Sequence, residues 1–235
     1  MKRKLIAEQI EPAVVSAAVV VALTVRQRCF YLFCALLLLI LLAPLLEQTT
    51  GGRLALNGIS LLVLISGAAA IGTGRLPLAL GLLLGGPAAA LQAAGLLFEK
   101  TSLLVLSWGF SAAFYLLVVG YLLTYALRRE VLTMDKLYGA AAAFIMVAVL
   151  WTYFYGILLV VHPGALTMGG TPISAATVST LIFFSVATLT STGMSDILPL
   201  HPIARMLCSL EMIAGVLFIA VLIARLAGTY PPDRR

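Results

Sequence analysis

The stretch Ala187–Pro199 reads A-T-L-T-S-T-G-M-S-D-I-L-P and decides how the rest of the chain is interpreted. It places a glycine among small hydroxyl residues, and then an aspartate, between two strongly apolar segments. Lipid cannot hydrogen-bond irregular backbone, so such a segment at membrane depth must line a watered cavity that protein encloses. The stretch therefore predicts the lining of an ion pathway.

The composition predicts an integral membrane protein. Hydrophobic residues make up 62% of the chain and charged residues 10%, with a mean hydropathy of +1.12. Its 235 residues leave room for about six spans of about 20 residues in membrane lipid, and for no soluble ligand-binding domain. The net charge of +6 is scattered over span ends rather than gathered into a stripe with aromatics, so no nucleic acid partner is expected.

Six apolar runs are predicted to cross the membrane: 29–46, 54–72, 78–98, 103–127, 137–161 and 206–227. Residues 1–28 are predicted to form a cytoplasmic or interfacial helix, because their apolar part is short and no signal-peptide cleavage pattern follows it. With both termini in the cytoplasm, twelve of the fifteen Lys and Arg residues lie on that side. The fourth span has no arginine at three-residue intervals, so no voltage-sensing charge array is expected.

A re-entrant helix over 173–189 is predicted between the fifth and sixth spans. Thr171 is suited to cap it and Pro172 to occupy its first position. It is too short to cross on its own, so its C-terminal dipole end would stabilise a cation near the bilayer middle. The chain would then climb back through 190–196 with carbonyls inward, and the hydroxyls of residues 190–192 would add oxygen ligands.

Several features of the chain carry more than one reading. Asp196 either attracts cations at the outer mouth or caps the following turn. Glu211, an acid inside the sixth span, contacts ions, pairs with Arg205, or hydrogen-bonds behind the half-crossing helix. The Gly85–Pro87 break marks a transporter binding site on a discontinuous helix or is a tolerated kink.

A transition-metal site at the outer surface is the weaker of two readings for another group of residues. It would use His162, His201, Met168 and Met194, whereas histidines beside prolines are ordinary loop residues. We expect no resident cofactor and no catalytic group, because no His, Cys, Ser and acid constellation converges at one membrane depth.

The residues from Lys136 to Gly228 resemble the tetrameric potassium channels, in particular the small bacterial six-span members that lack a voltage sensor. The resemblance is carried in order by L-Y-G-A-A, H-P-G-A, V-A-T-L-T, the segment 190–196, I-L-P-L-H-P-I-A-R and L-E-M-I-A-G-V-L-F-I-A-V-L-I-A-R-L-A-G. It implies an all-α homotetramer in the bacterial inner membrane, with the pore on a four-fold axis.

The resemblance also implies a division of the chain. A four-helix peripheral domain would span 29–130, a pore domain 131–228 and a cytoplasmic tail 229–235. The pore domain would hold the pore helix 173–189, the filter 190–196 and the inner helix 203–228, in which Gly215 matches the family's hinge. A glycine there is equally compatible with close helix packing.

The filter departs from the family pattern T-V-G-Y-G-D. The cation pathway is expected to follow six residues and to end at Asp196: Thr190, Ser191, Thr192, Gly193, Met194 and Ser195. Met194 replaces a tyrosine that holds the filter's width, and Met is flexible and donates no hydrogen bond. Ser195 replaces a glycine, where a positive φ would cost about 1–2 kcal/mol per subunit.

These departures predict a channel that passes monovalent cations with weakened or altered potassium selectivity. A non-conducting regulatory or assembly protein with a decayed filter is the alternative. A secondary transporter ranks below both, because the second half of the chain does not mirror the first.

Overall fold

The computed structural model describes residues 28–70, 75–98, 101–127 and 133–227. The predicted N-terminal helix before Arg28 and the predicted tail lie outside these ranges. Within them the chain forms seven helices and three short strands: α2 Arg28–Leu46, α3 Thr50–Ala70, α4 Arg75–Phe98, α5 Thr101–Leu127, α6 Met134–Val161, β1 Leu166–Met168, β2 Thr171–Ile173, α7 Val178–Leu189, β3 Ile197–Pro199 and α8 Pro202–Ala227.

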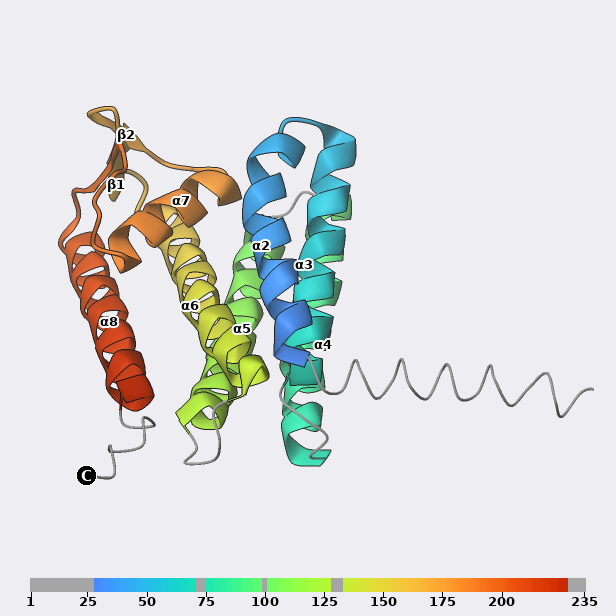
Figure 1. Cartoon of the computed structure of the whole chain (residues 1–235). Coiled ribbons are helices and arrows are strands. Elements are labelled where there is room, and N and C mark those ends of the chain that lie inside the picture. Colours follow the sequence, from blue (N-terminus) through green and yellow to red (C-terminus); the bar gives the residue numbers. More distant parts are fainter. Residues whose placement is uncertain (1–27, 71–74, 99–100, 128–132, 228–235) are drawn as a thin grey trace, which may run out of the picture.

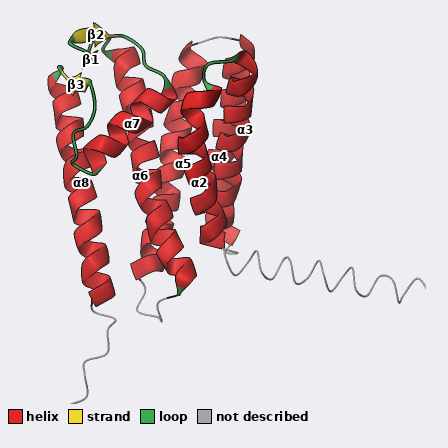
Figure 2. Ribbon diagram, turned by 45° about the horizontal axis from the view of Figure 1, so that its top comes forward, coloured by secondary structure: helices red, strands yellow, loops and turns green. Residues whose placement is uncertain are grey.

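The long helices α2 to α6 stand side by side, each packed against the next one along the chain (Figure 1). Helix α8 stands at the edge of the molecule, where it contacts α6, α7 and β3. The short helix α7 lies obliquely across the upper half, between α2 and α8, and the chain returns from it to the strands at the top (Figure 2). The strands therefore mark one end of the bundle, and α7 reaches only part of the way to the other.

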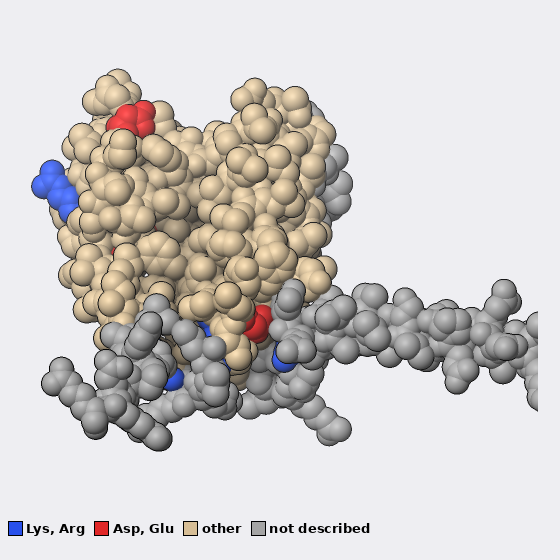
Figure 3. Space-filling view, viewed as in Figure 1, with Lys and Arg blue, Asp and Glu red and all other residues tan. Residues whose placement is uncertain are grey.

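Four of the described helices are long and apolar enough to cross a membrane: Arg28–Leu46, Val105–Leu127, Met134–Val161 and Pro202–Arg225. Three further helices hold only shorter apolar parts: Ala55–Ala70, Ala79–Gln92 and Val178–Leu189. The molecule is accordingly an all-α membrane protein, and six spans stays a prediction for α3 and α4. A broad, almost uncharged band covers the middle of the face in Figure 3, between charged groups toward the two ends.

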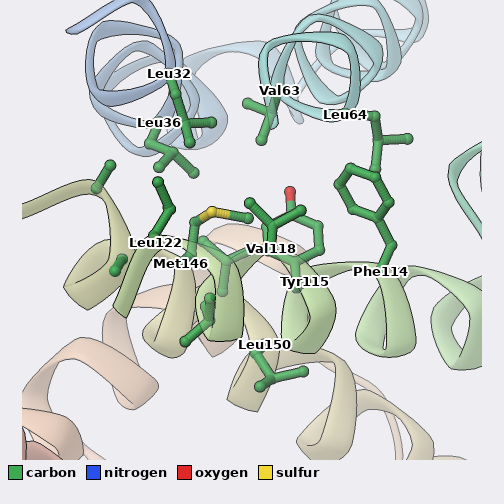
Figure 4. Packing of buried hydrophobic residues seen from close by; sticks show 14 of the residues in the cluster. Leu32, Leu36, Val63, Leu64, Phe114, Tyr115, Val118, Leu122, Met146 and Leu150 are labelled. Carbon is green, nitrogen blue, oxygen red and sulfur yellow. The ribbon is translucent and has the colours of Figure 1, made fainter. Parts of the chain in front are cut away.

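The larger core joins α2, α3, α5 and α6 (Figure 4). The Phe114 ring packs against two glycines. A Cβ atom added to Gly67 would lie 3.3 Å from the ring, and one added to Gly85 would lie 3.2 Å from it. Gly85 therefore admits the aromatic ring. Helix α4 is continuous through Pro87, so the Gly85–Pro87 segment is no helix break and the transporter reading loses its structural basis.

The first turn of α2 is capped by an acid from α6. Asp135 Oδ1 accepts a hydrogen bond from the Cys29 amide at 3.1 Å, and its Oδ2 accepts one from the Tyr125 hydroxyl at 3.1 Å. The first amides of a helix have no partner within the helix, so a carboxylate there satisfies one of them. The end of the bundle opposite the strands is thus tied together across α2, α5 and α6.

A β-hairpin occupies the place where the sequence predicted a helix start. Strands β1 and β2 pair through the turn Gly169–Gly170, whose φ angles of +56° and +85° fit a type I′ turn. Pro172 is tolerated because β2 is an edge strand of the order β2-β1-β3. The prediction of a helix from residue 173 with Thr171 as its cap is therefore wrong, and α7 begins at Val178.

Candidate ion pathway

The beginning of α7 is held by two groups. Thr177 is the N-cap and its hydroxyl accepts from the Thr180 amide at 3.3 Å. Glu47, in the turn after α2, accepts from the Ser179 amide at 3.0 Å and from the Ser179 hydroxyl. An acid at this position also suits the positive end of the helix dipole. Sequence reasoning missed Glu47, because it lies far from Ser179 in the chain and only the fold brings the two together.

The end of α7 is a Schellman motif. The Ser191 amide donates to the Thr188 carbonyl at 2.9 Å, and the Thr192 amide donates to the Ala187 carbonyl at 3.0 Å. This pair of bonds satisfies helix-end carbonyls and needs a left-handed residue just past the helix, which is usually glycine. Here that residue is Ser191, with φ +55°.

The backbone strain lies at Ser191, whereas the sequence raised the possibility of a positive φ only at Ser195. Among the described residues, Ser191 is the one non-glycine residue with positive φ, and Gly193 follows it at +64°. Ser195 is spared, and its hydroxyl accepts from the Ile197 amide at 3.1 Å. The condition for a Cβ penalty at Ser195, a positive φ, is not met in this structure, because the left-handed positions are those of the helix cap and Gly193.

The hydroxyls predicted as cation ligands help to close the helix end. Thr190 Oγ1 donates to the Val186 carbonyl at 2.7 Å, and Thr192 Oγ1 donates to the Ala187 carbonyl at 3.3 Å. The residues from Thr190 to Met194 are all exposed, Met194 to 76%. The segment is tied to α7 at its start and to the strands at its end.

Asp196 closes the segment beside the hairpin. Its carbonyl accepts from the Gly169 amide at 3.2 Å, and its side chain is exposed. It also lines a cavity of about 480 Å³ between α2 and α7, together with Met168, Ser179 and Phe183. The structure thus places Asp196 at the strand end of the molecule with its backbone fixed. The Ile197 amide of the following turn is bound by the Ser195 hydroxyl, so the capping reading gains no support and the outer-mouth reading stays a prediction.

Gly215 lets the end of α7 approach α8 closely. A Cβ atom on Gly215 would lie 1.9 Å from the Leu189 carbonyl oxygen, far inside contact distance. Helix α8 is continuous from Pro202 to Ala227. The geometry favours close packing over the hinge reading for this glycine.

Glu211 is fully buried between three helices. Its Oε2 accepts from the Tyr155 hydroxyl at 2.5 Å and its Oε1 lies 2.5 Å from the Ser185 hydroxyl. Arg205 is exposed, and its Nε donates to the Pro199 carbonyl instead. Of the three readings of Glu211, the structure places it in hydrogen bonds behind α7. Sequence reasoning missed Tyr155, because it lies far from Glu211 in the chain and only the fold brings the two together.

His162 and His201 lie together beside the strands. Their rings stack with centroids 4.6 Å apart and an angle of 16° between the planes, and His201 Nδ1 accepts from the Ile203 amide at 3.3 Å. Within the described ranges, no three His, Cys, Asp or Glu residues gather into a group that could hold a metal ion. His201 thus accepts a hydrogen bond at the beginning of α8, and His162 stacks on its ring.

The segment from α6 to α8 is also where the chain is similar to known proteins. Residues 141–230 match a family model described as ion channel. The match spans less than half of the chain and supports an ion channel family, which suggests a protein that is not an enzyme. No curated protein and no solved structure matches the chain.

Proposed function

We propose that the chain assembles as a homotetramer around a four-fold axis and passes monovalent cations passively across a membrane, with weakened potassium selectivity. The observation that carries the proposal is the path from Val178 to Pro199. The short helix α7 runs from the strand end to a point part-way along the bundle. An exposed irregular segment follows it and returns to the same end. In lipid, such backbone is stable only where protein encloses a watered space.

The length and direction of α7 suit a re-entrant pore helix. Twelve residues make a helix about 18 Å long, against about 30 Å for the hydrocarbon core of a bilayer. Its C-terminal end points inward and carries the negative end of the helix dipole, which stabilises a cation in a watered cavity. The exposed segment 190–196 then supplies carbonyl and hydroxyl oxygens along the pathway.

The surface of α8 supports assembly. Its buried residues form one stripe, Ala204, Cys208, Glu211 and Gly215, which faces α6 and α7. Most of the remaining surface of the helix is exposed and apolar: Met206, Leu210, Met212, Ile213, Val216, Leu217, Ile219, Val221 and Ile223. We assign this face to neighbouring copies and to the inner pathway, as the resemblance to tetrameric channels implies.

Charge supports the orientation of the chain in the membrane. Helix α2 begins with Arg28, Lys136 lies in the first turn of α6, and Arg225 lies in the last turn of α8, all at the end opposite the strands. Cytoplasmic ends of spans are rich in Lys and Arg. We therefore place that end, and both termini, in the cytoplasm of a bacterium, with the chain in the inner membrane.

Ion flux through purified protein in liposomes tests the proposal. We expect potassium and sodium to pass, with a reversal potential in opposed gradients that lies between the two equilibrium potentials. A reversal potential at the potassium value would contradict weakened selectivity. The absence of flux for both ions would contradict conduction and favour the non-conducting alternative.

The filter residues are tested by restoring the family's side chains. We expect Met194→Tyr with Ser195→Gly to move the reversal potential toward potassium, because a tyrosine hydroxyl can hold the filter's width. Met134→Tyr is the matched control. Met134 is also exposed, to 73%, but it is the first residue of α6 and lies at the end of the bundle opposite the strands. Equal effects of the two changes would show that the filter assignment is wrong.

A further inference from the structure

The hydrogen bonds around Glu211 determine its protonation state when their hydrogens are counted. Four groups meet behind α7: the Glu211 carboxyl, the Tyr155 and Ser185 hydroxyls, and the Ala148 carbonyl. Ser185 Oγ donates to Ala148 O at 2.7 Å and lies 2.5 Å from Glu211 Oε1. Tyr155 Oη lies 2.5 Å from Glu211 Oε2 and 3.4 Å from Cys208 Sγ.

Ser185 has one hydroxyl hydrogen and two oxygen neighbours. A carbonyl oxygen only accepts, so the contact with Ala148 needs the hydrogen of Ser185. An ionised carboxylate also only accepts. With Glu211 ionised, Ser185 Oγ and Glu211 Oε1 would therefore face each other at 2.5 Å with no hydrogen between them.

A proton on Glu211 completes the set. The carboxyl O–H then donates to Ser185, Ser185 donates to Ala148, and Tyr155 donates to the second carboxyl oxygen. The Cys208 thiol has a hydrogen of its own for Tyr155 Oη. Each contact then holds one hydrogen.

We propose that Glu211 is a neutral, protonated acid whose proton lies on Oε1 and is donated to Ser185, and that this acid positions α7 between α6 and α8. Any effect of this acid on conduction rests on the proposed function, because Ser185 lies on α7, the helix that ends at the proposed filter segment. The protonation state itself does not depend on conduction.

The charges around the carboxyl agree with a neutral acid. Helix α7 and strand β3 contain no ionisable residue. Helix α6 presents Tyr155 and has its Asp135 and Lys136 in the first turn, at its opposite end. On α8, Cys208 lies one turn before Glu211 and Arg205 is directed to Pro199.

The end of α7 adds to the penalty for a charge. The Leu189 carbonyl meets Gly215, one turn along α8 from Glu211, so the negative end of the helix dipole is close to the carboxyl. A fully buried carboxylate with no cation among its hydrogen-bond partners is unstable in an apolar interior. Protonation removes this penalty.

Glutamine at position 211 has the same shape and the same hydrogen pattern as the protonated acid. Its amide nitrogen donates to Ser185 and its oxygen accepts from Tyr155. We expect Glu211→Gln to keep the melting temperature of the wild type. Glu211→Ala should lower it, because Ser185 then keeps only Ala148 as a partner and Tyr155 keeps only Cys208.

Infrared spectroscopy of the full chain in lipid at neutral pH tests the proton directly. We expect the wild type minus Glu211→Gln difference to contain the C=O band of a protonated carboxylic acid that shifts in D₂O. The Asp196→Asn variant should keep the band. A difference spectrum that holds only carboxylate bands would overturn the proposal, whatever the flux assay shows.

A second variant keeps the test open if Glu211→Gln does not fold. Ser185→Ala removes the acceptor of the proposed proton, so the same carboxylic acid band should move to higher frequency as its hydrogen bond is lost. A band that stays in place in Ser185→Ala would show that the proton is not on the oxygen that faces Ser185, and would overturn the assignment.

Discussion

At the scale of single residues, the segment 190–196 contains two serines with different backbone conformations, of which only Ser191 is strained. Ser191 takes the left-handed conformation at the end of α7, and Ser195 takes an ordinary one although the family pattern has glycine there. A residue's place in a helix cap depends on where the helix ends. Comparison with the family's filter letters does not reveal that end, which is why the sequence did not indicate the positive φ of Ser191.

The strained position makes a stability prediction. Replacing Ser191 by glycine removes the Cβ from a left-handed residue and should raise the free energy of unfolding by up to about 1 kcal/mol. Ser195→Gly is the matched control and should lower it by roughly 0.5–1 kcal/mol through added freedom of the unfolded chain. Thermal unfolding in detergent measures both. A larger gain at Ser195 would show that the cap is assigned to the wrong residue.

At the scale of elements, α7 is fixed at its start by Glu47, in its middle by Glu211 and at its end by contact with Gly215. Two of these three contacts come from α8 and the third from the turn after α2. The sequence predicted a helix that ends at Leu189, and α7 ends there. It placed the start too early, because Thr171 and Pro172 suit a helix start equally well as they suit an edge strand, and only pairing with Leu166–Met168 decides between them.

The contact between α7 and α8 predicts the effect of one methyl group. Gly215→Ala should lower the free energy of unfolding by about 1–3 kcal/mol, because the Cβ would overlap the Leu189 carbonyl oxygen and force the two helices apart. Gly120→Ala, where no atom lies within 4 Å of the added Cβ, is the control and should be neutral or stabilising. Similar losses for both variants would contradict close packing at Gly215.

The cap from Glu47 predicts a smaller effect. Glu47→Ala should lower the free energy of unfolding by about 1 kcal/mol, because the Ser179 amide loses its acceptor at the start of α7. Gln48→Ala removes an exposed side chain that reaches only the Pro44 carbonyl, and it should have no measurable effect. Thermal unfolding of the two variants side by side measures the difference, and an inert Glu47→Ala would remove this contact from the account.

At the scale of the whole molecule, the sequence predicted the class and the order of the helices, and the matching ion channel segment lies where the filter was expected. The assembly was inferred from resemblance. Nothing in a single chain's periodicity states what covers an exposed apolar face, because lipid and a second copy of the chain are both apolar partners. Among the described helices, α8 has one narrow buried stripe, so its remaining surface is where neighbours are expected.

Cross-linking tests that assembly. In a background with the exposed Cys34 changed to serine, Val216→Cys on α8 should give chains joined by disulfides on mild oxidation. Leu83→Cys is the control, since Leu83 is exposed to 65%, against 58% for Val216, on a peripheral helix. Products of equal yield at the two positions would place the interface elsewhere.

Two carboxylates each cap a helix other than their own, and this limits how the helices can be combined with those of another protein. Asp135 of α6 caps α2 at one end, and Glu47, next to α2, caps α7 at the other. In a chimera that joins α2 to the pore of another protein, the Cys29 amide would lose its acceptor Asp135, and the pore helix would gain Glu47 without Ser179 as its partner. Transplanting both acids together with their partners, Cys29 and Ser179, is therefore the design rule that this architecture imposes.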